Sequence, residues 1–125
     1  MVPADRKYTR EHEWVLIEDG IAKIGITDHA QSELGDIVYV ELPEIGDKYD
    51  CGDAIATVES VKAASGIYTV VGGEVVEVND ELNDAPEKLN SDAYDTFIVA
   101  VKVSEVTDSE LLTAEEYEEF LAQEA

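Results

Sequence analysis

The sequence has few of the residues that most often reveal a protein's chemistry. It contains 1 cysteine, Cys51, which excludes an intramolecular disulfide bond and a cysteine-based metal site. Its 2 histidines, His12 and His29, lie far apart without the spacing of metal ligands, so we assign them structural or surface roles and predict no metal. A nucleophile motif with a histidine base, a glycine-rich phosphate loop and a zinc pattern are also absent. We therefore predict a protein that is not an enzyme.

Long apolar runs are absent as well. No stretch of the sequence reaches about 20 apolar residues, the length of a membrane-spanning helix. Residues 1–7 lack both the apolar centre of a signal peptide and the Arg- and Ser-rich pattern of a transit peptide. We therefore expect a cytoplasmic protein, or a mature form that has already been trimmed.

Basic residues are scarce, with 8 Lys and Arg against 30 Asp and Glu, which gives a net charge of −22. A surface of this charge repels nucleic-acid phosphates and anionic membranes, so neither is an expected partner. The acids are spread over the whole chain, which favours adaptation to a halophilic cytoplasm, where salt screens their repulsion. An ordinary acidic, soluble protein is the alternative.

The residues that are present favour one folded domain, residues 1–125, since hydrophobic residues make up 45% of the chain. Residues 14–18 and 21–26 flank Asp19-Gly20, a pair that suits the positive φ angles of a two-residue hairpin turn. Further strands are expected at residues 37–42, 55–58, 67–71, 74–78 and 96–103.

Three of these segments carry more detailed expectations. Residues 37–42 have apolar side chains on both faces, as the interior of a sandwich requires. Gly72-Gly73 is expected to turn the chain into the strand that follows. Alternation along residues 96–103 places one set of side chains on a shared face, namely Phe97, Val99, Val101 and Val103.

Helices are expected at three places. Thr27 or Asp28 can cap a short helix that runs through Leu34 and ends at Gly35. Asp84, followed by Pro86, indicates a second helix start. Residues 113–116 form a capping box, and an apolar stripe follows for core packing at Tyr117, Phe120 and Leu121. The whole pattern predicts a mainly β fold, an antiparallel β-sandwich or flattened barrel with short helices and a C-terminal helix.

Lys62 is the only cation between the expected strands at 55–58 and 67–71. The small side chains of Ala63 and Ala64 beside it cannot bury it, so its amine is offered to solvent. A flexible lysine amine of this kind is a target for acylation. The alternative is an ordinary hairpin lysine, which the spacing alone favours.

Most of the chain, from about Tyr8 to the C-terminal helix, resembles the glycine cleavage system H-protein family. The segment around Lys62 is similar to the lipoate-attachment hairpin of that family. Blocks along the chain match in the family's order. Residues 8–15 (YTREHEWV) look like the family's opening strand and residues 25–36 (GITDHAQSELGD) like its early helix, and the later blocks are 38–43 (VYVELP), 59–63 (ESVKA) and 73–79 (GEVVEVN).

The resemblance implies a lipoyl/biotinyl-carrier type of sandwich with lipoate on Lys62. The family's arm accepts an aminomethyl group from a pyridoxal-phosphate glycine decarboxylase, the P protein. It presents that group to a tetrahydrofolate-dependent aminomethyltransferase, the T protein, and a dihydrolipoyl dehydrogenase, the L protein, reoxidises it. A lipoate ligase or lipoyl transferase would attach the arm, and we expect a monomer. Biotin is disfavoured because the flanks of Lys62 are not methionines.

Three acids join Lys62 as candidate site residues through the resemblance. Glu59 is expected to be exposed near the turn and to help the ligase recognise Lys62. Many family members have an acid at the position of Gly66 that helps hold the aminomethyl nitrogen. Because Gly66 cannot do so, Glu13 is assigned that role, with Glu11 as a possible second acid.

The sequence also departs from the family pattern at residues 90–97 (NSDAYDTF), which lack the family's proline and glycine and have Phe97 in place of tryptophan. Three functions therefore stay open. The first is the glycine cleavage carrier, and the second is an H-like relay that donates lipoate to other proteins. The third is a non-acylated interaction module on the same sandwich.

Overall fold

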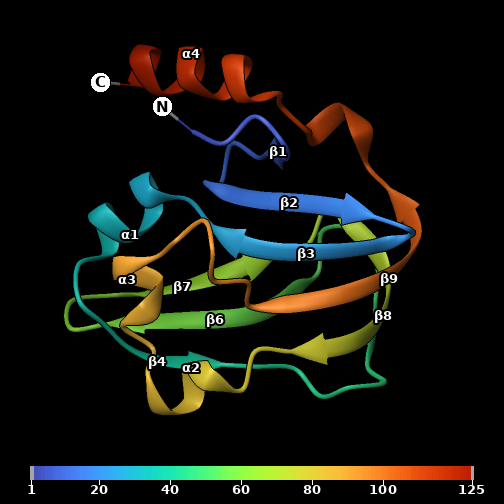
Figure 1. Cartoon of the computed structure of the whole chain (residues 1–125), viewed down its shortest axis with the longest axis horizontal. Coiled ribbons are helices and arrows are strands. Elements are labelled where there is room, and N and C mark those ends of the chain that lie inside the picture. The colour runs from blue at the N-terminus through green and yellow to red at the C-terminus, as the bar shows by residue number, and fades with distance from the viewer. Residues whose placement is uncertain (1, 125) are drawn as a thin grey trace.

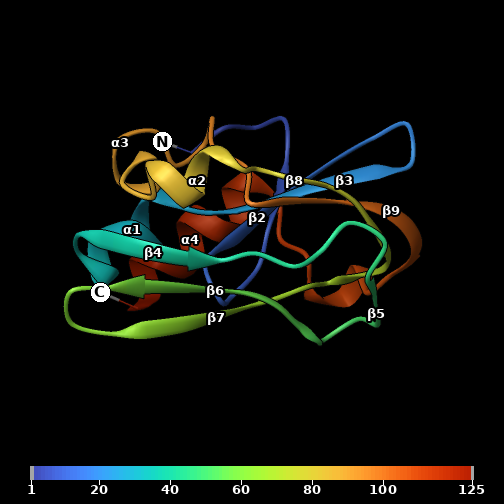
Figure 2. The ribbon, with the colours of Figure 1, turned by 90° about the horizontal axis from the view of Figure 1, so that it is seen from below.

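Two antiparallel sheets form the body of the protein in the computed structural model, which describes residues 2–124. The larger sheet has the order β1 (Lys7–Tyr8), β2 (Glu13–Glu18), β3 (Ile21–Ile26), β9 (Val99–Val106), β8 (Val71–Val78) and β5 (Lys48–Tyr49). The smaller sheet has the order β4 (Ile37–Glu41), β6 (Ala54–Ser60) and β7 (Ala64–Tyr68). This arrangement confirms the predicted mainly β, antiparallel architecture (Figures 1 and 2).

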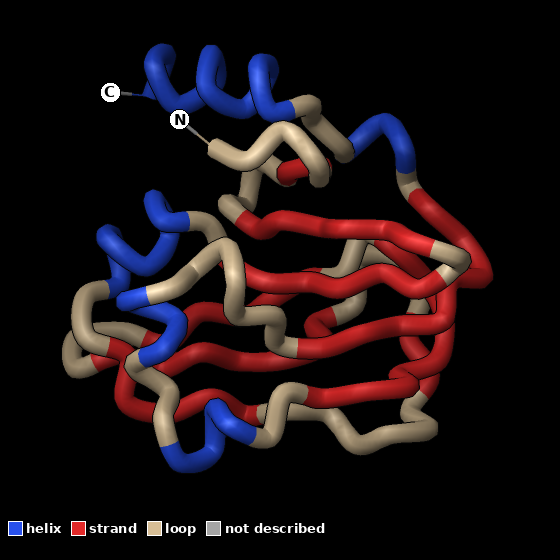
Figure 3. The backbone as a smooth tube through the Cα atoms, viewed as in Figure 1, coloured by secondary structure: helices blue, strands red, loops and turns tan. Residues whose placement is uncertain are grey.

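Short helices lie around the periphery of the strands (Figure 3). They are α1 (Asp28–Leu34), α2 (Glu81–Asp84), α3 (Lys88–Ser91), a 3-10 turn (Asp108–Glu110) and α4 (Ala114–Glu124). Within residues 2–124, we find no helix with the length and apolar character needed to cross a membrane.

Three of the local signals at chain turns and helix ends are confirmed. Asp19 and Gly20 have φ angles of 52° and 78° and join β2 to β3, as the two-residue turn requires. The Thr27 side chain caps α1 by accepting from the Ala30 N–H, and α1 ends at Gly35. At α4, the Thr113 N–H donates to Glu116 Oε1 at 2.9 Å and the Glu116 N–H donates to Thr113 Oγ1 at 3.2 Å, which completes the capping box.

Two apolar clusters hold these elements together. The first lies between the sheets and contains fully buried side chains such as Ile24, Val58 and Val75. The second lies where α4 covers β1 and β2, and its buried members are Tyr8, Trp14, Leu112 and Tyr117. The Tyr8 and Tyr117 rings are stacked with centroids 4.9 Å apart, so the stripe predicted on α4 is indeed core packing.

The expectation of a turn at Gly72-Gly73 was wrong. Both glycines lie inside β8, where the pairing with β9 shifts register between Gly72 and Gly73. A Cβ atom added at Gly73 would lie 2.0 Å from the Lys102 carbonyl oxygen of β9. Gly73 is therefore needed because two strands approach each other closely there. In the sequence alone, such a glycine looks like part of a turn.

Three further expectations need correction. The segment 8–15 is not one strand, because a turn at Thr9 to His12 separates β1 from β2, with the His12 N–H bonded to the Thr9 carbonyl. In β4, Val38 and Tyr39 are 54% and 49% exposed, since a register shift between Ile37 and Tyr39 turns them outward. The first three residues of β9 and the residue before it are all buried, namely Ile98, Val99, Ala100 and Val101. Both faces of β9 are therefore covered at its start, where buried and exposed side chains do not alternate.

The helix expected to start at Asp84 was also placed wrongly. Asp84 ends α2, and Pro86 lies in the link before α3, which begins at Lys88. The Leu89 N–H donates to the Pro86 carbonyl, so proline precedes a helical turn as its missing N–H allows.

Candidate lysine attachment site and neighbouring acidic pocket

Lys62 lies at the tip of the hairpin formed by β6 and β7, which Figure 2 shows at one edge of the molecule. The last strand pair before the tip is Glu59 with Ala64, and the Ser60 N–H then bonds to the Ala63 carbonyl at 2.7 Å. The tip residues Val61, Lys62 and Ala63 are exposed. The predicted hairpin is therefore present, although its second strand runs from Ala64 to Tyr68 and not over residues 67–71. Its paired strands fix the position from which the lysine projects.

Ser60 shapes this tip, a role that our sequence interpretation missed. Its Oγ accepts the N–H of Lys62 at 3.3 Å and the N–H of Ala63 at 3.1 Å. A serine that bonds to backbone groups two and three residues later forms a local turn. The backbone conformation at Lys62 is therefore held by hydrogen bonds from main-chain N–H groups to the Ser60 hydroxyl, and the lysine side chain takes no part in them.

The tip is also tied to the rest of the fold. The Val61 N–H donates to the Asp36 carbonyl at 3.1 Å, in the link between α1 and β4. Asn90 braces that link, because its Nδ2 donates to the Gly35 carbonyl and its Oδ1 accepts the Ile37 N–H, each at 2.9 Å. The Lys62 Cε lies 3.5 Å from where a Cβ on Gly35 would be, so glycine leaves room beside the lysine stem.

The Lys62 amine is exposed, and no carboxylate whose position the structure describes forms an ion pair with it. Glu59 is partly buried rather than exposed as expected, because it pairs with Tyr39 of β4 and with Ala64 of β7. The lysine is thus accessible to a modifying enzyme, and Glu59 lies beside it on a rigid strand.

Glu13, the first residue of β2, is only 2% exposed. Its carboxylate lies beside the end of β7 that is farther from the hairpin tip. Its Oε2 accepts the N–H of Tyr68 at 2.8 Å and its Oε1 accepts the Thr9 hydroxyl at 3.1 Å. Burial raises the pKa of the Glu13 carboxyl to about 7, although both hydrogen bonds oppose the rise. Glu13 therefore joins the end of the smaller sheet to the larger one, and its carboxyl holds a proton more readily than an exposed glutamate does.

A cavity of about 320 Å³ opens beside Glu13 and is lined also by Glu11, Cys51 and Tyr68. Glu11 is exposed, and its charge contributes to the raised pKa of Glu13. A Cβ on Gly66 would lie 3.2 Å from the Tyr68 phenol ring, so this ring lies over the position where many family members have an acid. Sequence reasoning proposed Glu13 and Glu11 as candidate site residues and did not consider Tyr68.

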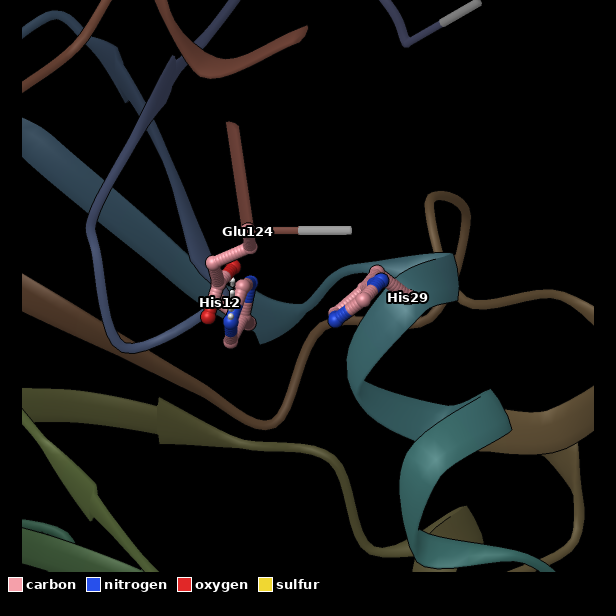
Figure 4. A group of neighbouring side chains, drawn as sticks. All are labelled: His12, His29 and Glu124. Atoms are coloured by element: carbon pink, nitrogen blue, oxygen red, sulfur yellow. Dashed lines mark ion pairs between the residues drawn. The ribbon is translucent and has the colours of Figure 1, made fainter. Parts of the chain in front are cut away.

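The two histidines, which the sequence separates, lie together in the fold. Their ring centroids are 4.4 Å apart, and Glu124 joins them from the end of α4 (Figure 4). The spacing in the sequence gave no signal of this contact, because it depends on α1 and α4 meeting the turn before β2. Cys51, by contrast, is a partly buried residue in a turn after β5.

What the attachment site can do chemically is limited and specific. It offers one accessible primary amine on a rigid hairpin tip, with a buried carboxylate at the far end of the adjoining strand. Such an arrangement suits a protein that carries a covalently attached group rather than one that transforms a substrate itself.

Comparison with known proteins agrees with this class. The family model for the glycine cleavage H-protein matches residues 6–124, so the chain belongs to that family. The glycine cleavage system H protein of Burkholderia cenocepacia is 52% identical over 122 residues, covering 96% of this chain and 97% of that protein. A probable glycine cleavage system H protein of Pyrococcus abyssi is 53% identical over 117 residues, covering 91% and 87% respectively.

A crystal structure of a glycine cleavage system H protein from Mycobacterium marinum has the same fold, with a TM-score of 0.91 at 38% identity over 97% of this chain and 99% of that one. Family membership supports a lipoyl-carrier role within the glycine cleavage system, as a component that is not itself catalytic. The family carries lipoate on a lysine, and the P and T proteins are the partners that membership implies.

Proposed function

We propose that the chain carries lipoate in amide linkage to the Lys62 Nζ and delivers the aminomethyl group of glycine from the P protein to the T protein. The observation that supports this most is the exposed lysine at the hydrogen-bonded tip of the β6–β7 hairpin. The L protein and a lipoate ligase or lipoyl transferase complete the proposed set of partners. The cytoplasmic location, the monomeric state and the halophilic adaptation remain predictions from the sequence.

The residues around Lys62 suit an acyl group on the amine. An amide removes the ammonium charge, and no ion pair among the side chains that the structure describes would be lost with that charge. Gly35 leaves space beside the lysine stem, and the tip conformation rests on hydrogen bonds from main-chain N–H groups to the Ser60 hydroxyl and the Asp36 carbonyl. Acylation therefore costs the fold little.

The path from Lys62 to Glu13 follows one strand. From Ala64 to Tyr68, β7 advances about 13 Å at the usual rise per residue, and the Tyr68 N–H is bonded to Glu13. Lipoate supplies a dithiolane that takes up the aminomethyl group and ends as a dithiol. Glu13 would accept a hydrogen bond from the cationic amine of the loaded arm, and the charge of that amine would favour the ionised carboxylate. Tyr68 and Glu11 border the same cavity.

A lipoyl relay would also carry lipoate on Lys62, so detecting the modification does not distinguish it from the glycine cleavage carrier. An activity assay does. The lipoylated protein, mixed with P, T and L proteins, should support glycine-dependent reduction of NAD. Lipoylated protein that fails in this assay but donates its lipoate to another lipoyl domain would identify the relay. Intact protein from native cells without the mass of a lipoyl group would instead identify the non-acylated module.

Glu13→Gln should shorten the lifetime of the aminomethyl-loaded protein by roughly tenfold or more. A charge-assisted hydrogen bond contributes about 1.5–3 kcal/mol, and glutamine removes the charge. The fold should persist, because the glutamine oxygen can accept the Tyr68 N–H and its amide can donate to Thr9. Spontaneous loss of the group, followed by mass spectrometry, measures the effect.

Glu11→Gln is the matched control for this prediction, because Glu11 is the exposed acid of the same cavity. We expect its effect on the lifetime to be smaller than that of Glu13→Gln. Lipoylation of Lys62 should proceed normally in both variants. An unchanged lifetime in Glu13→Gln would remove Glu13 from the site.

Glu59→Ala should slow lipoylation of Lys62 several-fold with little loss of stability. Glu59 lies three residues before the lysine and keeps part of its surface exposed, so a ligase that docks on the tip meets its charge. Surface substitutions usually change stability by within about 0.5 kcal/mol. Initial rates of lipoyl incorporation provide the measurement, with Glu18→Ala in the β2–β3 hairpin as the control. Equal rates for wild type and Glu59→Ala would exclude the recognition role.

A further inference from the structure

Three potential metal ligands converge beneath the end of α4. His12 belongs to the turn before β2, His29 to the first turn of α1, and Glu124 to the last turn of α4 (Figure 4). One ligand atom from each residue lies within 4.8 Å of the other two, and His12 Nε2 is 3.4 Å from Glu124 Oε2. The carrier role described above uses none of these side chains.

The His12 ring is oriented by partners behind it. Its Nδ1 lies 2.8 Å from the Tyr117 hydroxyl, which in turn lies 2.8 Å from the Thr27 hydroxyl. When Nδ1 carries the proton and donates to Tyr117, Nε2 is left with its lone pair beside Glu124. This is the tautomer in which a metal-binding histidine is usually fixed, with the second ring nitrogen donating to an oxygen.

His29 has a similar support. Its Nε2 lies 3.0 Å from Glu33 Oε1, one helical turn later on α1.

We propose that His12, His29 and Glu124 bind a divalent transition-metal ion, with zinc as the ion that this donor set fits best. Two imidazoles and one carboxylate are zinc ligands, and metal–ligand distances of about 2.0–2.2 Å place neighbouring tetrahedral donors roughly 3.4 Å apart. The His12–Glu124 separation already has this value. The widest separation of 4.8 Å closes with a side-chain movement of about 1.5 Å.

Such an ion would cross-link three segments of the fold. It would join the C-terminal end of α4 to the turn before β2 and to the start of α1, three segments that are distant in the sequence. The fourth coordination position is left for water. The prediction of no metal rested on the separation of the histidines in the sequence, and the fold removes that argument.

The test is calorimetric titration of zinc into untagged, chelator-treated protein. Because 30 acids attract cations without specificity, the titration is made in high salt with excess Mg²⁺, which occupies exposed carboxylates. We expect one zinc per chain, and cobalt in place of zinc should give the visible absorption of a histidine-ligated site. Zinc should also raise the melting temperature of the wild-type protein.

His29→Gln and Glu124→Gln are the informative variants, since neither residue belongs to the buried core. Each should weaken zinc binding at least tenfold and abolish the zinc-dependent rise in melting temperature. Glu119→Gln removes an exposed charge from the same helix and should bind zinc as the wild type does. Equal zinc affinity in all four proteins, or no binding above that to surface carboxylates, would overturn the proposal and leave a histidine pair held by Glu33 and Glu124.

Discussion

Lys62→Arg should abolish lipoylation completely and leave the fold intact. Arginine keeps the positive charge and a long stem but does not form the amide. The bonds that shape the tip come from the Ser60 side chain and from main-chain groups of Val61 and Asp36, so they are independent of the side chain at position 62. Intact mass of protein from native cells should lose the lipoyl increment, while the melting temperature should stay within about a degree of the wild type.

Lys48→Arg is the matched control, because Lys48 is an exposed lysine on β5. It should be lipoylated as fully as the wild type. An acylated Lys62→Arg protein, or native wild-type protein that is never modified, would contradict the assignment of Lys62. The glycine-dependent assay should fall to background with Lys62→Arg and be unchanged with Lys48→Arg.

Gly73→Ala should cost about 3–5 kcal/mol of folding free energy. The added Cβ would lie 2.0 Å from the Lys102 carbonyl oxygen and 2.9 Å from Val101 Cγ1. Strand β9 cannot retreat, since it is paired with β3 on one side and β8 on the other. Overpacking costs typically 1–3 kcal/mol and the strained φ of +156° adds a similar amount, against a total stability of about 5–15 kcal/mol.

Denaturant unfolding provides the measurement, and Gly46→Ala provides the control. Gly46 also has a positive φ, +99°, but a Cβ there meets no atom within 4 Å. Its substitution should therefore show the backbone strain without the collision. If Gly73→Ala proved as stable as Gly46→Ala, the close approach of β8 and β9 would not be the reason for this glycine.

The sequence predicted best the features that depend on neighbouring residues. The turn at Asp19-Gly20 and the capping box at Thr113 are local, because the residues that make the bonds are within a few positions of one another. The hairpin around Lys62 is local in the same sense, although its chemical role came from the family resemblance and not from spacing.

Features that depend on distant parts of the chain were missed or misread. Gly72-Gly73 has the composition of a turn, and only the position of β9 shows that it belongs to a strand. The contact of His12 with His29 requires α1 to pack beside the turn before β2. The raised pKa of Glu13 requires burial beside β7, which no pattern in residues 9–13 indicates.

Trp14, buried in the cluster under α4, provides an intrinsic fluorescence signal for unfolding. It is the sole tryptophan, 2% exposed, and its indole N–H donates to the Ala93 carbonyl at 3.0 Å while the Arg6 guanidinium lies 4.6 Å from its ring. Unfolding will move this indole from a dry, hydrogen-bonded setting into water and shift its fluorescence emission to longer wavelength. None of the substitutions above alters the ring or these two contacts, so one intrinsic signal compares the unfolding of every variant without a label.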